Sequence, residues 1–203
     1  DETNQAMIAA AAMATGQTVL DVGAGTGEPA MSIALHVGET GRVVACDIAA
    51  EMLAGTQRRA AALALGNVSC TVADMECLPF GDAGFDALTC RFGLMFTTDR
   101  DAAAAEACRV LKPGARAVYT VWGPVEDNTV YLVSEPLVKA YFGLPDPDTP
   151  SRRHSLGAPG TVAGILEHAG FTQVEERAIA EVARLPVGQR FWHSRLQRNF
   201  ADR

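Results

Sequence analysis

The residues with the clearest chemical meaning lie between Thr18 and Pro29, where an apolar segment runs into a glycine-rich turn, TVLDVGAGTGEP. Gly23, Gly25 and Gly27 let the backbone adopt conformations that other residues avoid, and they let a ligand approach the main chain closely. The unpaired N–H groups at the start of the following helix then face the turn. These residue types in this order predict a nucleotide cradle.

The turn departs from the dinucleotide fingerprint G-x-G-x-x-G. Counting from Gly23 and Gly25, the third glycine should be residue 28, and residue 28 is Glu. A carboxylate at this place repels a pyrophosphate but tolerates or attracts a cationic ligand. We therefore expect a nucleoside ligand without phosphates.

The segment resembles the first motif of class I S-adenosylmethionine (SAM) dependent methyltransferases, a strand ending in (D/E)-x-G-x-G-x-G. The resemblance covers roughly residues 17 to 123 and continues, in the order and spacing of that family, through VVACDI at 43–48, CTVADM at 70–75, FDALTCRFGLMF at 85–96 and RVLKPG at 109–114. Over 90–123 the chain is similar to the branch that includes ubiquinone and menaquinone biosynthetic C-methyltransferases. The resemblance implies SAM as methyl donor, S-adenosylhomocysteine as product and a small-molecule acceptor.

Two acidic residues after successive strands carry the cofactor argument. Asp47 lies 22 residues after Gly25, where a carboxylate can accept hydrogen bonds from both ribose hydroxyls; a capping aspartate at a strand end is the alternative. In the resembled family, the residue at the position of Asp74 accepts from the adenine amine, and the next residue, here Met75, packs on the ring. Ile48 is a candidate for the opposite ring face, while an ordinary core role for Met75 stays open.

The segment Cys90–Phe92 follows the fourth predicted strand, at the carboxyl edge where open α/β folds bind ligands. In the resembled family this segment lines the methionine end and the acceptor pocket. Arg91 is interpreted as a partner of the methionine carboxylate or of an anionic acceptor, or alternatively as a surface or helix-capping arginine. Phe92, Met95 and Phe96 are expected in the apolar wall or in the core. The full set of expected cofactor-binding residues is Gly23, Ala24, Gly25, Gly27, Asp47, Ile48, Asp74, Met75, Cys90 and Arg91.

Catalysis by this chemistry needs no nucleophilic triad or metal, because the sulfonium of SAM is already an activated electrophile. Holding methyl and acceptor in line is worth about 7–11 kcal/mol, and no His/Cys/Asp group in the sequence has metal-ligand spacing. Carbon acceptors and many oxygen acceptors additionally need a base. The candidate is His154, in the loop Arg152–His154, with a surface histidine as the alternative; no other catalytic residue is identified.

Alternating strand and helix patterns predict an α/β fold, a Rossmann-like, doubly wound, mostly parallel sheet with a small helical insertion. Short apolar runs without strict alternation suit parallel strands buried on both faces. The pattern predicts strands at 18–22, 42–46, 68–73, 85–90 and 115–122, and helices at 4–14, 28–37, 50–65 and 100–111.

We expect one domain over residues 1–203, with a core of about 17–123 plus 159–185 and an insertion of about 124–158. The pattern of the second half predicts a helix at 128–142 kinked by Pro136, a proline-rich loop at 144–150, a helix at 160–169, a strand at 171–177, a possible strand at 181–185 and a helix at 188–201.

The acceptor side is expected to be incomplete, because the chain begins at Asp1 without an initiator methionine and only about three residues precede the first predicted helix. Related enzymes carry further amino-terminal residues that fold over the methyl donor. We expect segment 120–158 to form the other wall, with Trp122, Tyr131 and the Arg152–His154 loop nearest the acceptor.

The net charge and the cysteines limit the classes of binding partner and the cellular compartments that we expect. The net charge of −7 lies in residues 1–100, which hold 12 acidic and 5 basic side chains; this disfavours nucleic acid, although the arginines at 184, 190, 195 and 198 leave that possibility open. Five cysteines without a C-x-x-C pair indicate reduced thiols and a cytoplasmic location. No apolar run reaches the roughly 20 residues that a membrane span needs. We expect a monomer or homodimer.

Two alternatives remain open. A nicotinamide-dependent (NAD-type) oxidoreductase is disfavoured by Glu28, by Asp74 with Met75 and by the 109–114 motif. A SAM-binding sensor or interaction protein without catalysis belongs to a different class, and only detection of methyl transfer excludes it. The acceptor and its nucleophilic atom are not defined by the sequence.

Overall fold

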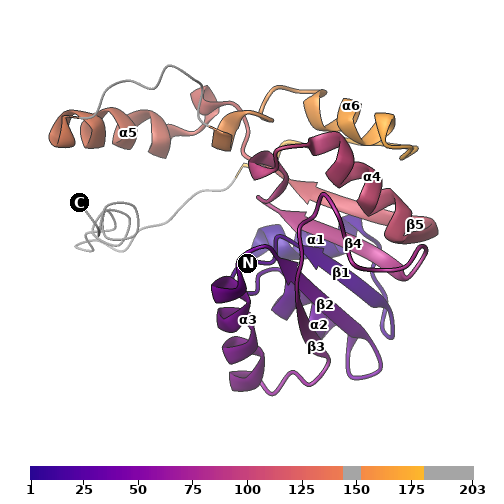
Figure 1. Ribbon diagram of the computed structural model, residues 1–203. Coiled ribbons are helices and arrows are strands. Elements are labelled where there is room, and N and C mark those ends of the chain that lie inside the picture. The colour runs from indigo at the N-terminus through magenta and orange to yellow at the C-terminus, as the bar shows by residue number, and fades with distance from the viewer. Residues whose placement is uncertain (144–151, 181–203) are drawn as a thin grey trace.

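The computed structural model describes residues 1–143 and 152–180 and is built on a five-stranded sheet (Figure 1). The strands follow the order β3-β2-β1-β4-β5, and all four pairings between neighbours are parallel. Their bounds are β1 Thr18–Val22, β2 Arg42–Asp47, β3 Val68–Val72, β4 Phe85–Arg91 and β5 Leu111–Thr120. The strand order reverses beside β1, which creates the crevice where open parallel sheets bind ligands. The predicted Rossmann-like α/β class is confirmed.

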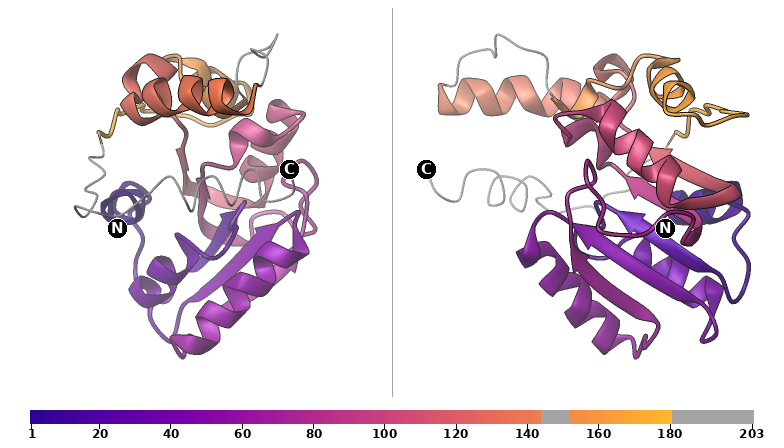
Figure 2. Two further views of the ribbon diagram at one scale, coloured as in Figure 1. Left: turned by 90° about the vertical axis from the view of Figure 1, so that its left-hand side faces the viewer. Right: turned by 45° about the vertical axis from the view of Figure 1, so that its right-hand side comes forward.

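Helices cover both faces of the sheet (Figures 1 and 2). Helices α1 (Glu2–Ala10), α2 (Ala30–Val37) and α3 (Ala50–Ala62) share one apolar cluster with Val19 and Val43, while α4 (Arg100–Val110) and α6 (Thr161–His168) share the other with Leu20 and Leu88. Successive strand residues point to opposite faces, so neighbouring residues of one strand enter different clusters. Within the described ranges, no helix is long and apolar enough to cross a membrane.

Most predicted elements of the first 120 residues are present, with shifted ends that have local causes. The first helix ends at Ala10 rather than 14, because Ala12 adopts a φ of 49°, which does not continue a right-handed helix. The last strand begins at Leu111, earlier than predicted. This strand contains a bulge between its residues 111 and 116, since Phe85 pairs with Leu111 but Ala87 pairs with Arg116.

The second half departs further from the expectation. Helix α5 (Thr129–Phe142) forms as predicted with Pro136 inside it, but it extends away from the sheet (Figure 1). No residue of α5 is buried, and several of its apolar side chains are exposed, among them Val133, Leu137 and Tyr141. Short 3-10 turns flank the helix, η2 at Val125–Asp127 and η3 at Arg152–His154, while η1 spans Leu94–Phe96.

The strand predicted at 171–177 is wrong, because residues 171–180 form no strand. This segment is held instead by a side chain, since the Glu176 carboxylate accepts hydrogen bonds from the backbone N–H groups of Gly160 and Ala163 at 2.7 and 2.9 Å. Those N–H groups belong to the start of α6, where donors lack helical partners. The predicted loop at 144–150, strand at 181–185 and helix at 188–201 lie outside the described residues.

Arg109 on α4 fixes the loop that follows the Asp74–Met75 segment. Its guanidinium donates to the carbonyls of Leu78 and Phe80, and also to the carboxylates of Asp82 and Glu106, at 2.7 to 3.1 Å. The same interaction lowers the pKa of Glu106. A planar fork with five donors is suited to such a set of acceptors, whereas an ammonium group is not.

We expect Arg109→Lys to lower the free energy of unfolding by about 1–3 kcal/mol, because several acceptors lose their donor. Urea denaturation measures the change. Arg116→Lys is the matched control, since Arg116 makes one exposed bond to the Ala10 carbonyl. Equal midpoints for the two variants would show that the clamp does not stabilise the fold.

Candidate functional site

The glycine turn between β1 and α2 lies at the carboxyl edge of the sheet, where the strand order reverses. Gly23, Gly25 and Gly27 have φ values of 66°, 55° and 105°, which favour glycine. A Cβ at Gly23 would lie 3.4 Å from the Gly93 Cα, so the two backbones pack closely. A Cβ at Gly25 would meet no atom of the described residues within 4 Å. The tip of the turn therefore has open space beside the Gly25 backbone.

Asp47 at the end of β2 holds this turn. Its Oδ2 accepts from the Gly25 N–H at 2.8 Å and its Oδ1 accepts from the Ala49 N–H at 2.9 Å. The second bond is the capping contact that was the alternative to ligand binding. The two roles are compatible, because a carboxylate offers about four acceptor sites and two remain for ribose hydroxyls.

Two residues of α3 support the turn and were missed by the sequence analysis. Buried Thr56 donates through Oγ1 to the Gly25 carbonyl at 2.9 Å, and Arg59 donates to the Thr26 carbonyl at 3.0 Å. The residues are three positions apart and so share one helix face. That spacing is their only sequence signal, and it is common in helices.

Glu28 is compensated by its neighbours. Its carboxylate pairs with Arg59 at 2.6 Å and accepts from Asn4 Nδ2 at 2.6 Å and Ser32 Oγ at 3.0 Å. Because its charge is paired, Glu28 repels a phosphate less than the sequence argument assumed. The case against a dinucleotide therefore depends more on the residues after β3.

The predicted adenine-binding residues lie on loops after β2 and β3, at the same edge as the turn. Ile48 is 70% exposed, Asp74 is exposed, and the terminal methyl of Met75 lies beside Gly23 and Gly93. Asp74 Oδ1 accepts from the Glu76 N–H at 2.9 Å. The arrangement offers an exposed apolar side chain and an exposed carboxylate to a planar base.

Cys90 and Arg91, at the end of β4, are placed differently from each other. The Cys90 side chain is buried, and burial raises the pKa of its thiol to about 12, so only its backbone can face a ligand. Arg91 donates to Asp1 Oδ2 at 2.8 Å and to Asn4 Oδ1 at 2.9 Å. Its two terminal nitrogens are thus engaged by the first helix and the residue before it.

An aromatic cluster, which we define as Phe92, Trp122, Tyr131 and His154, continues from β4 and β5 to η3. The rings of Phe92 and Trp122 stack with centroids 4.7 Å apart, and Tyr131 contacts Trp122 and His154 edge-on at 5.4 and 5.3 Å. The predicted acceptor-side residues Trp122, Tyr131 and His154 therefore lie together. His154 is half-buried, and its Nε2 is buried, so it is not a surface histidine.

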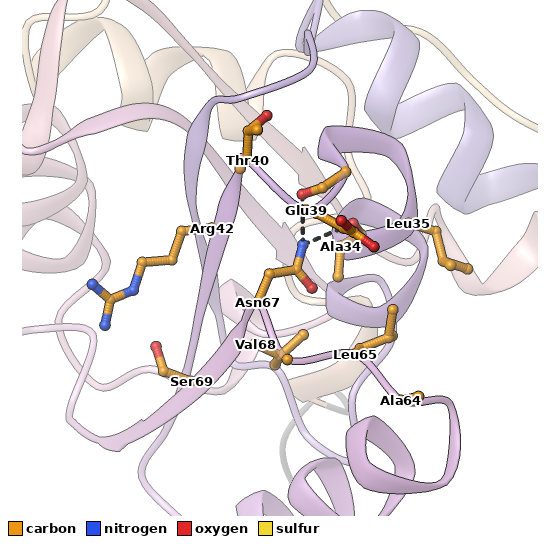
Figure 3. A pocket seen from close by; sticks show the side chains of 13 residues that line it. Ala34, Leu35, Glu39, Thr40, Arg42, Ala64, Leu65, Asn67, Val68 and Ser69 are labelled. Carbon is orange, nitrogen blue, oxygen red and sulfur yellow. Dashed lines mark hydrogen bonds between the residues drawn. The ribbon is translucent and has the colours of Figure 1, made fainter.

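A hollow lies at the opposite edge of the sheet, lined by residues of α2, β2, β3 and the loops before these two strands (Figure 3). The Asn67 side chain at its centre donates to the carbonyls of Ala34 and Gly38 at 3.0 Å. This polar group stabilises the fold, so we place no function there. Over residues 1–143 and 152–180, no group of three potential ligand side chains could hold a metal.

The parallel order of five strands, the glycine turn after β1 and the carboxylate after β2 define a Rossmann-like fold of the class I methyltransferase type. The chain is similar to a crystal structure of a SAM dependent methyltransferase from Aquifex aeolicus, with a TM-score of 0.64, 24% identity and coverage of 82% of this chain and 78% of that chain. The model of the ubiE/COQ5 methyltransferase family matches residues 3–130. The chain belongs to this family.

Curated relatives support the same assignment. The chain is 42% identical over 112 residues to the ubiquinone/menaquinone biosynthesis C-methyltransferase UbiE of Francisella tularensis subsp. tularensis (strain FSC 198), covering 55% of this chain and 45% of the relative. It is 42% identical over 127 residues to UbiE of Escherichia coli O1:K1 / APEC, covering 62% and 48%. The chain spans about half the length of these relatives.

Asp21 on β1 lies buried beneath the turn and joins three elements. Its carboxylate accepts from Thr89 Oγ1 of β4 at 2.7 Å and from the N–H of Ala30, the first residue of α2, at 3.2 Å. Burial raises the pKa of Asp21 to about 7. The native state therefore binds a proton that the unfolded chain releases between about pH 4 and pH 7.

The contribution of Asp21 to the free energy of unfolding should fall as pH rises from 4 to 8, because the folded pKa of Asp21 lies above its unfolded value. We expect Asp21→Asn to remove this loss. Between pH 4 and pH 8, the unfolding free energy of the variant relative to the wild type should rise by on the order of 4 kcal/mol. The pKa of Asp21 is raised by about three units, and each unit corresponds to about 1.4 kcal/mol. Urea denaturation at several pH values measures it, and a difference independent of pH would contradict the expectation.

Proposed function

We propose that this protein binds SAM and transfers its methyl group to a small-molecule acceptor by in-line displacement. The observation that carries the proposal is the open Gly25 backbone with the Asp47 carboxylate 2.8 Å from its N–H. A carboxylate beside a main chain that a ligand can approach supports a site for the ribose of a nucleoside. Family membership and the residues after β3 favour the nucleoside of SAM over a dinucleotide.

The residues fit the parts of SAM as follows. The turn from Gly23 to Gly27 supports close approach of the ligand, Asp47 accepts from the ribose hydroxyls, and Asp74 accepts from the adenine amine. Ile48 and Met75 contact the two faces of the base. The local excess of carboxylates also suits a ligand that carries a positive charge.

When bound, SAM supplies a methyl group on a positively charged sulfur, which needs no further activation. The protein has to hold the acceptor in line with the methyl group and exclude water. Phe92 contributes to this at the acceptor side, because the next residue, Gly93, packs against Gly23. The aromatic cluster thus begins where the cofactor turn ends.

We propose a planar aromatic acceptor of the quinol type, methylated on a ring carbon. Two observations support it: the stacked rings of Phe92 and Trp122, which suit a flat apolar molecule, and the similarity to ubiquinone/menaquinone biosynthesis C-methyltransferases. A quinol ring is also electron-rich, so its carbon can act as the nucleophile once a hydroxyl proton is removed.

We also propose a cytoplasmic location and assembly as a monomer or homodimer. All five cysteines lie within the described residues and are free thiols, which suits a reducing compartment. Light scattering on the purified protein distinguishes monomer from homodimer, and a larger species would contradict this proposal.

Asp47→Ala should weaken binding of both SAM and S-adenosylhomocysteine by about 1–3 kcal/mol, because ribose hydroxyls lose their acceptor. Isothermal calorimetry measures both affinities. Asp101→Ala, in the exposed first turn of α4, is the control and should bind as wild type does. Tight binding of NAD instead of SAM would favour the oxidoreductase, and unchanged affinity in folded Asp47→Ala would remove Asp47 from the site.

Gly25→Val should abolish SAM binding while a cooperative thermal transition is retained. The φ of 55° strains a branched residue, and its side chain would fill the space that Gly25 leaves open. Gly66→Val is the matched control, since Gly66 also has no atom within 4 Å of a Cβ but has no positive φ. Normal binding by Gly25→Val would show that the turn only connects strand and helix.

A further inference from the structure

The two ring nitrogens of His154 differ in their hydrogen bonding. Its Nδ1 lies 2.9 Å from the Gly123 carbonyl oxygen, while its Nε2 is buried and has no hydrogen-bond partner among the described residues. A carbonyl oxygen only accepts, so Nδ1 carries the proton and Nε2 of the neutral ring carries a lone pair. A buried acceptor without a donor is unfavourable, and such groups in native proteins call for an explanation.

The surroundings of His154 connect this lone pair to the proposed methyl-donor site. His154 contacts Tyr131 edge-on and lies 6.4 Å from the Trp122 ring, which stacks on Phe92. Arg153, which precedes His154 in the same 3-10 turn, also contacts the cluster. Its guanidinium lies over the Tyr131 ring, 4.6 Å from the ring centroid. The aromatic cluster therefore runs without interruption from Gly93, beside the glycine turn, to His154.

We propose that His154 Nε2 is the base that takes the proton from the methyl acceptor, an inference that rests on the proposed function. In this step the acceptor atom forms a bond to the methyl carbon while the carbon–sulfur bond breaks, and its electron pair stays on sulfur. The acceptor proton moves to Nε2, which gives an imidazolium that later releases it to water. The Gly123 carbonyl keeps the ring in the required tautomer and orientation throughout.

An acceptor has to displace a neighbouring side chain to reach Nε2, because no solvent touches this atom. We expect Tyr131 to be the side chain that moves, because it contacts His154 edge-on and lies on a helix without a buried residue. Its ring is replaced in the contact by the ring of the acceptor. In this arrangement the hydroxyl of the acceptor donates a hydrogen bond to His154 Nε2.

The catalytic test uses the full chain, SAM and a naphthohydroquinone as the acceptor probe, under anaerobic conditions. We expect His154→Gln to lower kcat at least about 100-fold, the range of general base catalysis, with SAM affinity by calorimetry and the acceptor KM unchanged. The acidic limb of the pH–rate profile should disappear, and added imidazole should restore activity to His154→Ala. His168→Ala, in the exposed end of α6, is the control and should match wild type.

A second measurement does not depend on the probe. Long-range proton–nitrogen NMR of the labelled chain, with the His154 signals assigned by their loss in His154→Gln, should show the proton on Nδ1. A proton on Nε2 overturns the inference, as does a His154→Gln variant with wild-type kcat and an intact acidic limb. A wild type that does not bind SAM contradicts the proposed function instead, so the two failures are distinguishable.

Discussion

The hydrogen bond between the Asp47 carboxylate and the Gly25 N–H is the contact on which the rest of the site depends. The parallel order brings the ends of β1 and β2 to one edge, and the φ of 55° at Gly25 lets its N–H meet Asp47. The Thr56 hydroxyl donates a hydrogen bond to the carbonyl of Gly25. Side chains thus bind both the N–H and the carbonyl of Gly25. The space that a side chain at residue 25 would occupy stays open among the described residues. A different residue at 25 would lose this combination.

Charge compensation explains how an acidic half of the chain forms a compact site. Glu28 pairs with Arg59, and Asn4 links Glu28 to Arg91, which also binds Asp1. Among the carboxylates that the structure describes, only Asp21 is buried without a cation in contact, and burial raises its pKa to about 7. The carboxylates left accessible at the edge, above all Asp74, are those assigned to the ligand.

Sequence patterns predicted the sheet and the glycine turn after β1, because short apolar runs and glycines act locally. The strand predicted at 171–177 failed for a non-local reason: Glu176 binds the start of α6, and no pattern in that segment shows this partner. Thr56 and Arg59 were missed for the same reason. Helix α5 was predicted over nearly the same residues, but the local sequence did not indicate that its apolar side chains stay exposed. Local chemistry was therefore easier to predict than long-range partners.

The elements on the two sides of the proposed site differ in how deeply their residues are buried. The donor side rests on strands β1, β2 and β4, whose core residues are almost entirely buried, whereas Tyr131 on the acceptor side lies on a helix without a buried residue. Segments with few buried contacts open at low free energy. An activated methyl group requires mainly positioning, so the donor side has to be invariant in shape while the acceptor side can adapt. His154, anchored to the Gly123 carbonyl, is the part of that adaptable side that keeps a fixed orientation, as a base must.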